Sequence, residues 1–278
     1  MPHIDARGVP LWIDQIGKGP PVVLLHGFAS EGRSLRPLVW ELDRQLTTIS
    51  VDLIGHARSG SPLSSEHYRL DQIVLDLVEV LHTSGFERAA WFGHGLGSRV
   101  ALEVALRCPD AVTTLVLEGT APGIRSDEQR ARHSAEQQAL AARIQTNGIP
   151  AFVDYWESLP LWDSQRTNLT EPQRQALQKE RYSHTATGLA KVLRGAGIDG
   201  GEWVGDRLRD LTVPVLLIAG SLDAGAVASA EWMAAQLPSA TLRVVEDAGH
   251  AAHLERPEAF GALVREFLLD AHGQSTST

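Results

Sequence analysis

Short apolar runs alternate with longer amphipathic segments along most of the chain. The apolar runs carry several β-branched or aromatic residues and end in turns that contain glycine, a pattern typical of buried strands. The predicted strands are residues 21–27, 46–55, 89–95, 112–120, 213–221 and 240–250. Helical periodicity covers residues 71–85, 98–110, 229–239 and 257–272. Strands that are apolar throughout are buried on both faces, so the sequence predicts an α/β fold with a mostly parallel central sheet flanked by helices.

The alternation is interrupted at two places. Residues 8–21, GVPLWIDQIGKGPP, predict an antiparallel hairpin at one edge of the sheet. Residues 123–208 are rich in Arg, Gln, Glu and Trp and show only helical patterns, which predicts a helical cap inserted between two strands. The chain is thereby divided into a first core part, 1–122, the cap, and a second core part, 209–272. The polar tail, 273–278, is predicted to be disordered.

Composition narrows the class of protein. The 278-residue chain has a formal net charge of −9, which argues against nucleic acid as a partner because phosphate binding needs a clustered positive surface. No apolar run approaches the roughly 20 residues of a membrane-spanning helix, and the first residues lack the pattern of a signal peptide. The single cysteine, Cys108, excludes an internal disulfide and favours a reducing, cytoplasmic compartment.

Polar residues gather at the ends of the predicted strands, where parallel α/β sheets bind their ligands. Asp223 and His250 each follow a strand, and we expect the carboxylate to hold one ring nitrogen and leave the other free to take a proton. The chain's histidines lack the spacing of a metal-ligand set, so no metal site is predicted.

Other polar residues near strand ends are expected to have structural roles. His26 should brace the loop that follows the first of the predicted core strands. Asp52 and His56 should brace the loop after the fourth strand, which is predicted within residues 46–55. His253, in the stretch HAAHLE, is expected to be structural and near the surface.

The turn in WFGHGLGS, residues 91–98, lies between a predicted strand and a predicted helix. Enzymes with the pattern G-x-S-x-G present a nucleophilic serine at the tip of such a turn, and here the tip is Gly95. Gly93 and Gly97 provide the small flanking residues that the tight turn needs. The amides of Leu96 and Phe28 are predicted to form an oxyanion hole, in which a donor is worth about 3–4 kcal/mol to a transition state.

The order of these motifs resembles the α/β-hydrolase fold. The motifs are LLHGF, DLIGHARSG, GHGLGSR, the helical cap, LLIAGSLD and EDAGHAAHLERPEAF, and together they cover nearly the whole chain. The cap segments EGTAPGIRSDEQRARHSAEQQALAARI, FVDYWESLPLW and ERYSHTATGLAKVLRGAGIDGGEWVGDRL resemble the 2-succinyl-6-hydroxy-2,4-cyclohexadiene-1-carboxylate synthases of menaquinone biosynthesis. That resemblance implies an enzyme without metal or cofactor, which removes a proton from its substrate and expels pyruvate to form a diene.

The same resemblance implies a small anionic substrate whose carboxylates are held by arginines, because a guanidinium group bonds a carboxylate with two parallel hydrogen bonds. The arginines at the matching positions are Arg99, Arg132 (or its neighbour Arg130) and Arg181. His94, Trp156 and Trp162 are expected among the substrate contacts, and Trp203 is a further candidate for the roof of the pocket. Two features depart from the family: Gly95 stands in place of its serine, and LDAGA lacks the expected lysine after Asp223.

A glycine forms no covalent intermediate, so three functions remain open. In the first, His250 and Asp223 act as a general base beside the oxyanion hole, and the enzyme performs proton abstraction with elimination, cyclisation or C–C cleavage on a carboxylated or polyketide-like carbonyl compound. In the second, the chain is a serine hydrolase or a synthase of the family named above whose nucleophile has been replaced by Gly95. In the third, it is a non-catalytic protein that binds a small molecule.

Overall fold

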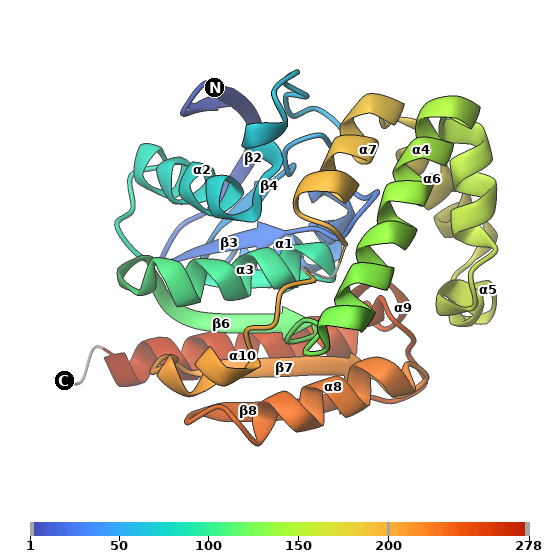
Figure 1. Ribbon diagram of the computed structural model, residues 1–278. Coiled ribbons are helices and arrows are strands. Elements are labelled where there is room, and N and C mark those ends of the chain that lie inside the picture. Colours follow the sequence, from blue (N-terminus) through green and yellow to red (C-terminus); the bar gives the residue numbers. More distant parts are fainter. Residues whose placement is uncertain (1–2, 199–200, 276–278) are drawn as a thin grey trace.

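A computed structural model describes residues 3–198 and 201–275, and its central feature is a twisted eight-stranded sheet (Figure 1). The strands are β1 His3–Ala6, β2 Val9–Gly17, β3 Pro21–Leu25, β4 Thr47–Val51, β5 Ala89–His94, β6 Val112–Glu118, β7 Val215–Gly220 and β8 Ala240–Val245. Their order in space is β1-β2-β4-β3-β5-β6-β7-β8, and the six strands from β4 to β8 in this order are parallel. The predicted parallel α/β sheet is therefore confirmed.

The antiparallel edge is also present. Its strands do not form the predicted hairpin within residues 8–21, however. β2 pairs with β1, which precedes it, and on its other side with β4. The sequence pattern missed β1 because its four residues are too few to show a clear alternation.

Helices cover both faces of the sheet. One face carries α1 Arg36–Leu42 and α10 Pro257–Ser275, and the other carries α2 Leu70–Thr83, α3 Leu96–Arg107 and α8 Ala224–Ala234 (Figure 1). Successive residues of β3 divide between the two layers, since Val22 and Leu24 pack with α1 and α10, whereas Val23 and Leu25 pack on the opposite face. The shorter helices are η1 Gly32–Leu35, η2 Ser65–Tyr68, η3 Pro109–Ala111, η4 Pro160–Trp162, η5 Gly205–Asp210 and α9 Ala252–Glu255.

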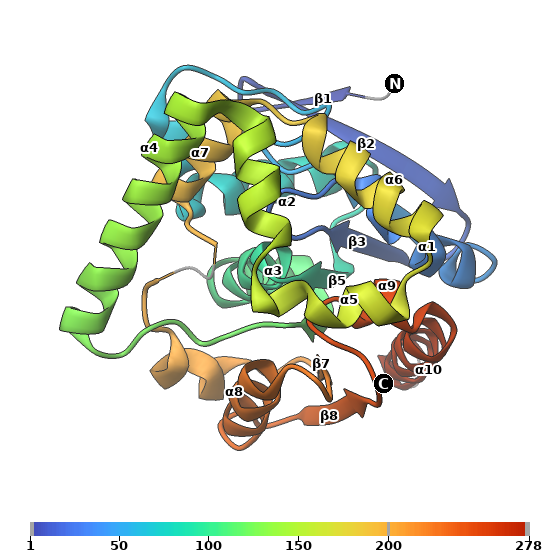
Figure 2. The ribbon, with the colours of Figure 1, turned by 90° about the vertical axis from the view of Figure 1, so that its right-hand side faces the viewer.

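The helical insertion lies between β6 and β7, as predicted. Its helices are α4 Asp127–Glu157, α5 Asp163–Asn168, α6 Glu171–Tyr182 and α7 Ala186–Gly195. A kink at Gly148, followed by Pro150, bends α4. Figure 2 shows these helices in front of the sheet, at the side toward which the arrow of β6 points in Figure 1. The cap therefore covers the carboxyl ends of the parallel strands.

Several element boundaries differ from the predicted ones, and those of α8 and α10 are examples. α8 begins at Ala224, because Asp223 caps its first turn, and α10 continues through Ser275. The expected disorder from residue 273 is therefore wrong for 273–275, and residues 276–278 lie outside the described part.

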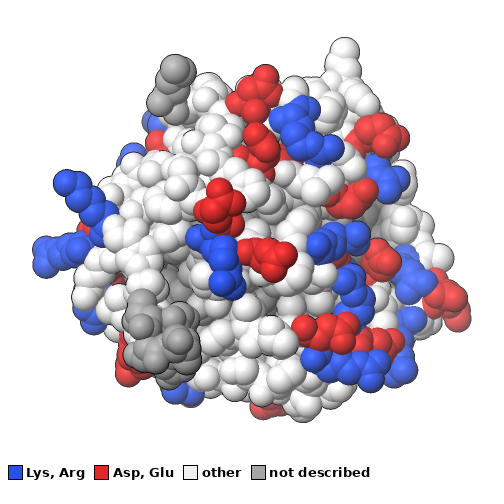
Figure 3. All heavy atoms as spheres, turned by 90° about the vertical axis from the view of Figure 1, so that its left-hand side faces the viewer, with Lys and Arg blue, Asp and Glu red and all other residues white. Residues whose placement is uncertain are grey.

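The hydrophobicity of the helices and the distribution of surface charge agree with what the composition predicted. Within the described residues, no helix is both long and apolar enough to cross a membrane. Figure 3 shows the face opposite the cap, where Lys and Arg alternate with Asp and Glu, as expected for a solvated surface.

Candidate active site

Asp223 and His250 meet at the carboxyl ends of the last two strands, as predicted. Asp223 follows β7 and accepts the Ala226 amide at the start of α8, at 2.9 Å. Its Oδ2 lies 2.7 Å from Nδ1 of His250, and both side chains are more than four-fifths buried. Burial by itself would raise the pKa of Asp223, but the hydrogen bond from His250 and the Ala226 amide outweigh it and lower that pKa. Asp223 therefore stays ionised and orients the imidazole, whose Nε2 faces Gly95.

The turn between β5 and α3 retains the geometry that presents a side chain at its tip. Gly95 has φ 52° and ψ −112°, a backbone conformation that side chains rarely adopt. A β-carbon built on Gly95 would lie 3.7 Å from Nε2 of His250 and 3.9 Å from the α-carbon of Gly27, both ordinary contacts. A β-carbon on Gly93 or Gly97 would overlap backbone atoms. The flanking glycines are therefore required by space, whereas Gly95 is not.

A small cavity of about 60 Å³ separates the tip of this turn from the cap. Residues from the core and from the cap both line it. The predicted site residues among them are Phe28, His94, Gly95, Leu96, Trp156, Trp162, Arg181 and His250. Sequence reasoning missed several others, of which Gln165, Leu177, Glu180 and Leu254 are examples. Glu180 and Leu254 lie inside quoted motifs, but nothing in those motifs marks them as site residues, and the packing of the cap on the core brings the set together.

Of the predicted arginines, Arg181 is the one that reaches the cavity within the described residues. Its Nη1 donates to Oε1 of Glu157 at 2.8 Å, and its guanidinium lies 5.5 Å from the centre of the Trp162 ring. Its side chain is 11% exposed, so a carboxylate bound in the cavity would meet a largely desolvated cation.

The predicted placement of Arg99 and Arg132 against the cavity is wrong. Arg99 is fully buried in α3, where it donates to Glu103 at 2.7 Å and to the carbonyl of Glu202 at 2.9 Å. The buried acidic residue one helical turn ahead draws it away from the tip of the turn, and burial lowers its pKa. Arg132 is exposed on α4, and its neighbour Arg130 instead pairs with Asp127.

The two predicted cap tryptophans form an aromatic roof. Trp156 packs 5.5 Å from Phe28 and 5.8 Å from Trp162, measured between ring centres. Trp162 lies 5.5 Å from His250 and presents its edge to that ring. Trp203 lies elsewhere, against Trp232. In the described part of the chain, the buried Nε1 of Trp162 has no hydrogen-bond partner, so a donor is available beside the cavity.

The expected bracing residues behave as predicted. His26 accepts the Leu53 amide on Nε2 at 2.9 Å, and its Nδ1 contacts the Gly27 carbonyl at 2.7 Å. Burial lowers the pKa of His26 to about 4, although Asp52 opposes this shift, so the ring is neutral at physiological pH. Asp52 accepts the Gly32 amide at 2.8 Å and Nε of Arg58 at 2.7 Å, which ties together the loops after β3 and β4.

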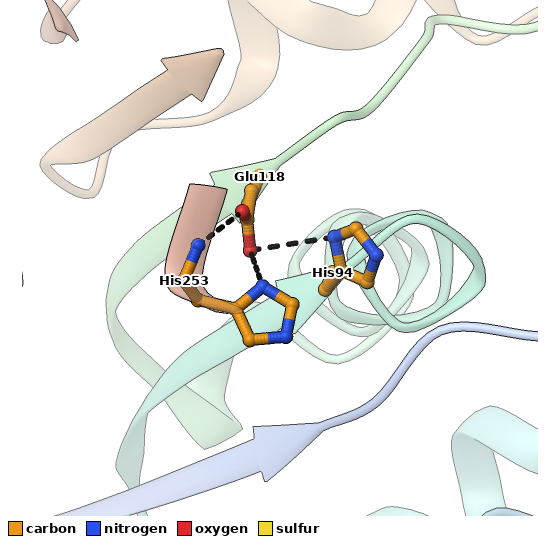
Figure 4. Close-up of side chains that lie close together, drawn as sticks. All are labelled: His94, Glu118 and His253. Carbon is orange, nitrogen blue, oxygen red and sulfur yellow. Dashed lines mark hydrogen bonds and ion pairs between the residues drawn. The ribbon is translucent and has the colours of Figure 1, made fainter. Parts of the chain in front are cut away.

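A second carboxylate with imidazole neighbours, Glu118, lies near the Asp223–His250 pair. Figure 4 shows it with its two histidines. Oε2 of Glu118, at the end of β6, is 2.7 Å from Nδ1 of His253 and 3.3 Å from Nδ1 of His94. His253 is 3% exposed, so its expected place near the surface is wrong: α9 turns it inward, and its amide donates to Oε1 of Glu118. Burial would raise the pKa of Glu118, but the two rings outweigh it and hold that pKa well below its usual range.

The sequence spacing did not reveal this grouping, because the three residues come from different elements. Their nitrogen and oxygen atoms lie within 4.8 Å of one another, a separation that a metal ion could bridge. Both Nδ1 atoms contact the carboxylate directly, however. The cluster is therefore held by close contacts of the carboxylate with both rings and by the hydrogen bond from the His253 amide.

Glu180 is another unpredicted residue of the cavity. It extends from α6 to the loop after β3, where its Oε1 accepts Oγ of Ser30 at 2.7 Å and the amide of Glu31 at 3.0 Å. Burial raises the pKa of Glu180 to about 7. Glu180 therefore joins the cap to the same loop that carries Phe28.

Known proteins share this fold and this arrangement of motifs. Residues 20–257 match the family model of the α/β hydrolase fold, and the chain belongs to that family. A Bacillus subtilis (strain 168) protein, provisionally named 2-succinyl-6-hydroxy-2,4-cyclohexadiene-1-carboxylate synthase, is 35% identical over 251 residues, which are 89% of each chain. The structure of MenH from S. aureus matches with a TM-score of 0.89 and 28% identity, over 94% of this chain and 98% of its own.

A third match has a different named activity. The enol-lactonase from Burkholderia xenovorans LB400 has a TM-score of 0.81 and 26% identity, over 96% of this chain and 100% of its own. The chain is thus an enzyme of the α/β-hydrolase superfamily, related to the synthases named above.

Proposed function

We propose that this enzyme removes a proton from a small carboxylated carbonyl compound and eliminates a leaving group, without a covalent intermediate. The observation that carries the proposal is the Asp223–His250 pair, whose free Nε2 faces a cavity with glycine at the nucleophile position. The named activity of the relatives supports a substrate of the synthase type, and Arg181 supplies a cation for one of its carboxylates.

In this mechanism the base is His250. Its Nε2 accepts the proton from a carbon beside the carbonyl group, and Asp223 stabilises the resulting imidazolium. The electron pair of the broken C–H bond forms an enolate, whose oxygen is held by the amides of Phe28 and Leu96. The pair then forms a new C=C bond as the leaving group departs. No step needs a serine hydroxyl.

The test measures turnover of the synthase substrate, with pyruvate release followed by a coupled assay and diene formation by absorbance. Replacing the base should remove most of the acid–base contribution, so we expect His250→Ala to reduce kcat/KM by about 1,000-fold or more. His272→Ala, an exposed histidine of α10, is the matched control and should leave turnover unchanged. Normal turnover by His250→Ala would exclude the mechanism.

A specific observation favours a second candidate, a serine enzyme whose nucleophile has been replaced. The open space at Gly95 would admit a serine beside Nε2 of His250. We therefore expect Gly95→Ser to gain esterase activity on p-nitrophenyl acetate, and Gly95→Ser/His250→Ala to lose it again. A folded Gly95→Ser protein without ester hydrolysis or improved synthase turnover would count against this candidate.

A further inference from the structure

His94 and His250 each have a carboxylate beside Nδ1, which is hydrogen-bonded in His250 and a looser contact in His94. A carboxylate contacts Nδ1 of each ring, Asp223 at 2.7 Å and Glu118 at 3.3 Å, and the two ring centres are 5.1 Å apart. Both rings line the cavity. Figure 4 shows Nε2 of His94 on the ring edge turned away from Glu118. A β-carbon placed on Gly27 would lie 3.3 Å from that Nε2, which therefore sits beside the loop that carries Phe28.

We propose that His94 is a second proton-transfer residue of this active site, with Glu118 and His253 as the residues that position it. The inference rests on the proposed function. It adds a general acid, His94, to the general base, His250. An elimination needs a proton donor for the departing group, and the dyad supplies a base alone.

The surrounding charges support a proton on this cluster. Glu118 is completely buried, and an ionised buried carboxylate needs a compensating positive charge or several donors. The ring of His94 lies between those of His253, at 4.6 Å, and His250, and it also interacts electrostatically with His26. Burial keeps the pKa of His26 low and its ring neutral, and His253 donates its own amide to Glu118. A proton on His94 or His253 therefore balances the carboxylate.

Protons and electrons balance over the cycle. His250 takes one proton from the substrate carbon, and the electrons of that bond form the new C=C bond while the bond to the leaving group breaks. Nε2 of His94 gives one proton to the oxygen of the leaving group. The enzyme then carries its extra proton on His250 instead of His94, and transfer between the two rings, whose centres are 5.1 Å apart, through solvent in the cavity restores the starting state.

The decisive variant is His94→Phe, which keeps an aromatic ring against His250 and His253. We expect kcat to fall about 100-fold or more while KM changes less than about threefold, because a lost acid affects the transition state and not substrate binding. His82→Phe is the matched control, since His82 is an exposed histidine that lies near a glutamate.

A rise in KM with normal kcat would overturn the proposal, because it would make His94 a binding residue only. If the phenylalanine disturbs folding, as judged by thermal unfolding, His94→Gln tests the same expectation with a smaller polar group. Glu118→Gln should lower kcat with little change in KM, since the ring of His94 loses the carboxylate beside its Nδ1. An unchanged kcat would contradict the positioning role.

A measurement without substrate separates this proposal from the proposed function. In ring ¹H–¹⁵N spectra of the wild-type protein, we expect Nδ1 of His94, which faces Glu118, to carry a proton. A bare Nδ1 would overturn the proposal. So would stoichiometric zinc that is lost with Glu118→Gln, because the Nδ1 atoms would then be metal ligands. Absence of pyruvate release by the wild type contradicts the proposed function, and the spectra then decide this proposal alone.

Discussion

Gly95 combines a strained backbone with free space. Its positive φ and its ψ of −112° belong to a turn that normally stores strain to expose a nucleophile. Glycine relieves that strain because it has no β-carbon. Gly97, two residues later, has the opposite requirement: a β-carbon there would overlap the carbonyl of Leu25, where α3 crosses β3. The turn thus contains two glycines required by packing, Gly93 and Gly97, and one, Gly95, that only relaxes the backbone.

This difference predicts two unequal stability effects. Gly95→Ala should reduce the free energy of unfolding by about 1–3 kcal/mol, the cost of the rare backbone conformation. Gly97→Ala should cost more than about 4 kcal/mol or prevent folding, because backbone atoms have to move. Urea denaturation followed by circular dichroism measures both effects. Equal effects of the two substitutions would show that the backbone is not closely packed at Gly97.

Helix α6 connects the cap to the oxyanion loop. Glu180 near its end accepts two hydrogen bonds from Ser30 and Glu31, and His184, just after the helix, places Nε2 3.0 Å from the carbonyl of Ser30. The backbone of this loop also carries Phe28, whose ring packs under Trp156. The position of the cap and the geometry of the proposed oxyanion hole are therefore coupled through one short segment.

The raised pKa of Glu180 predicts a pH dependence of stability. Below its ordinary pKa of 4.5 the carboxyl is protonated in both the folded and unfolded states, whereas between 4.5 and about 7 the folded state retains a proton that the unfolded state has lost. This group therefore makes the free energy of unfolding decrease as pH rises through that range. Glu180→Gln should remove the decrease and stabilise the protein at pH 8 by about 2 kcal/mol, after allowance for partial exposure.

Chemical denaturation at pH 5 and pH 8 measures this effect. Glu171→Gln, on the same helix but exposed and paired with Arg174, is the control and should keep the wild-type slope between these values. A Glu180→Gln protein with the wild-type slope would show that Glu180 ionises normally.

At the scale of the whole molecule, the cap limits access to the site. The cavity of about 60 Å³ is far smaller than the roughly 300–1,000 Å³ of typical ligand pockets. Its walls belong to both parts of the fold, with Trp156, Trp162 and Arg181 from the cap and His250 from the core. Binding of a substrate with several carboxylates therefore requires the cap to shift relative to the sheet.

Local patterns in the sequence determined the sheet, the inserted cap, the Asp223–His250 pair and the turn at Gly95. Strand and helix periodicity reports burial within a few residues, and the ends of parallel strands meet at one edge of the sheet whatever the details of packing. The identity of the turn's tip was likewise visible directly, since its flanking glycines mark the tight connection between β5 and α3.

Only the tertiary structure decided which side chains reach the cavity. The rotation of α3 turned Arg99 toward Glu103, and α4 left Arg132 in solvent, although both lie at positions that the family resemblance favoured. Glu118 and His253 meet across 135 residues of sequence, and Glu180 meets Ser30 across 150. Such contacts depend on how whole elements pack, and no local periodicity encodes them.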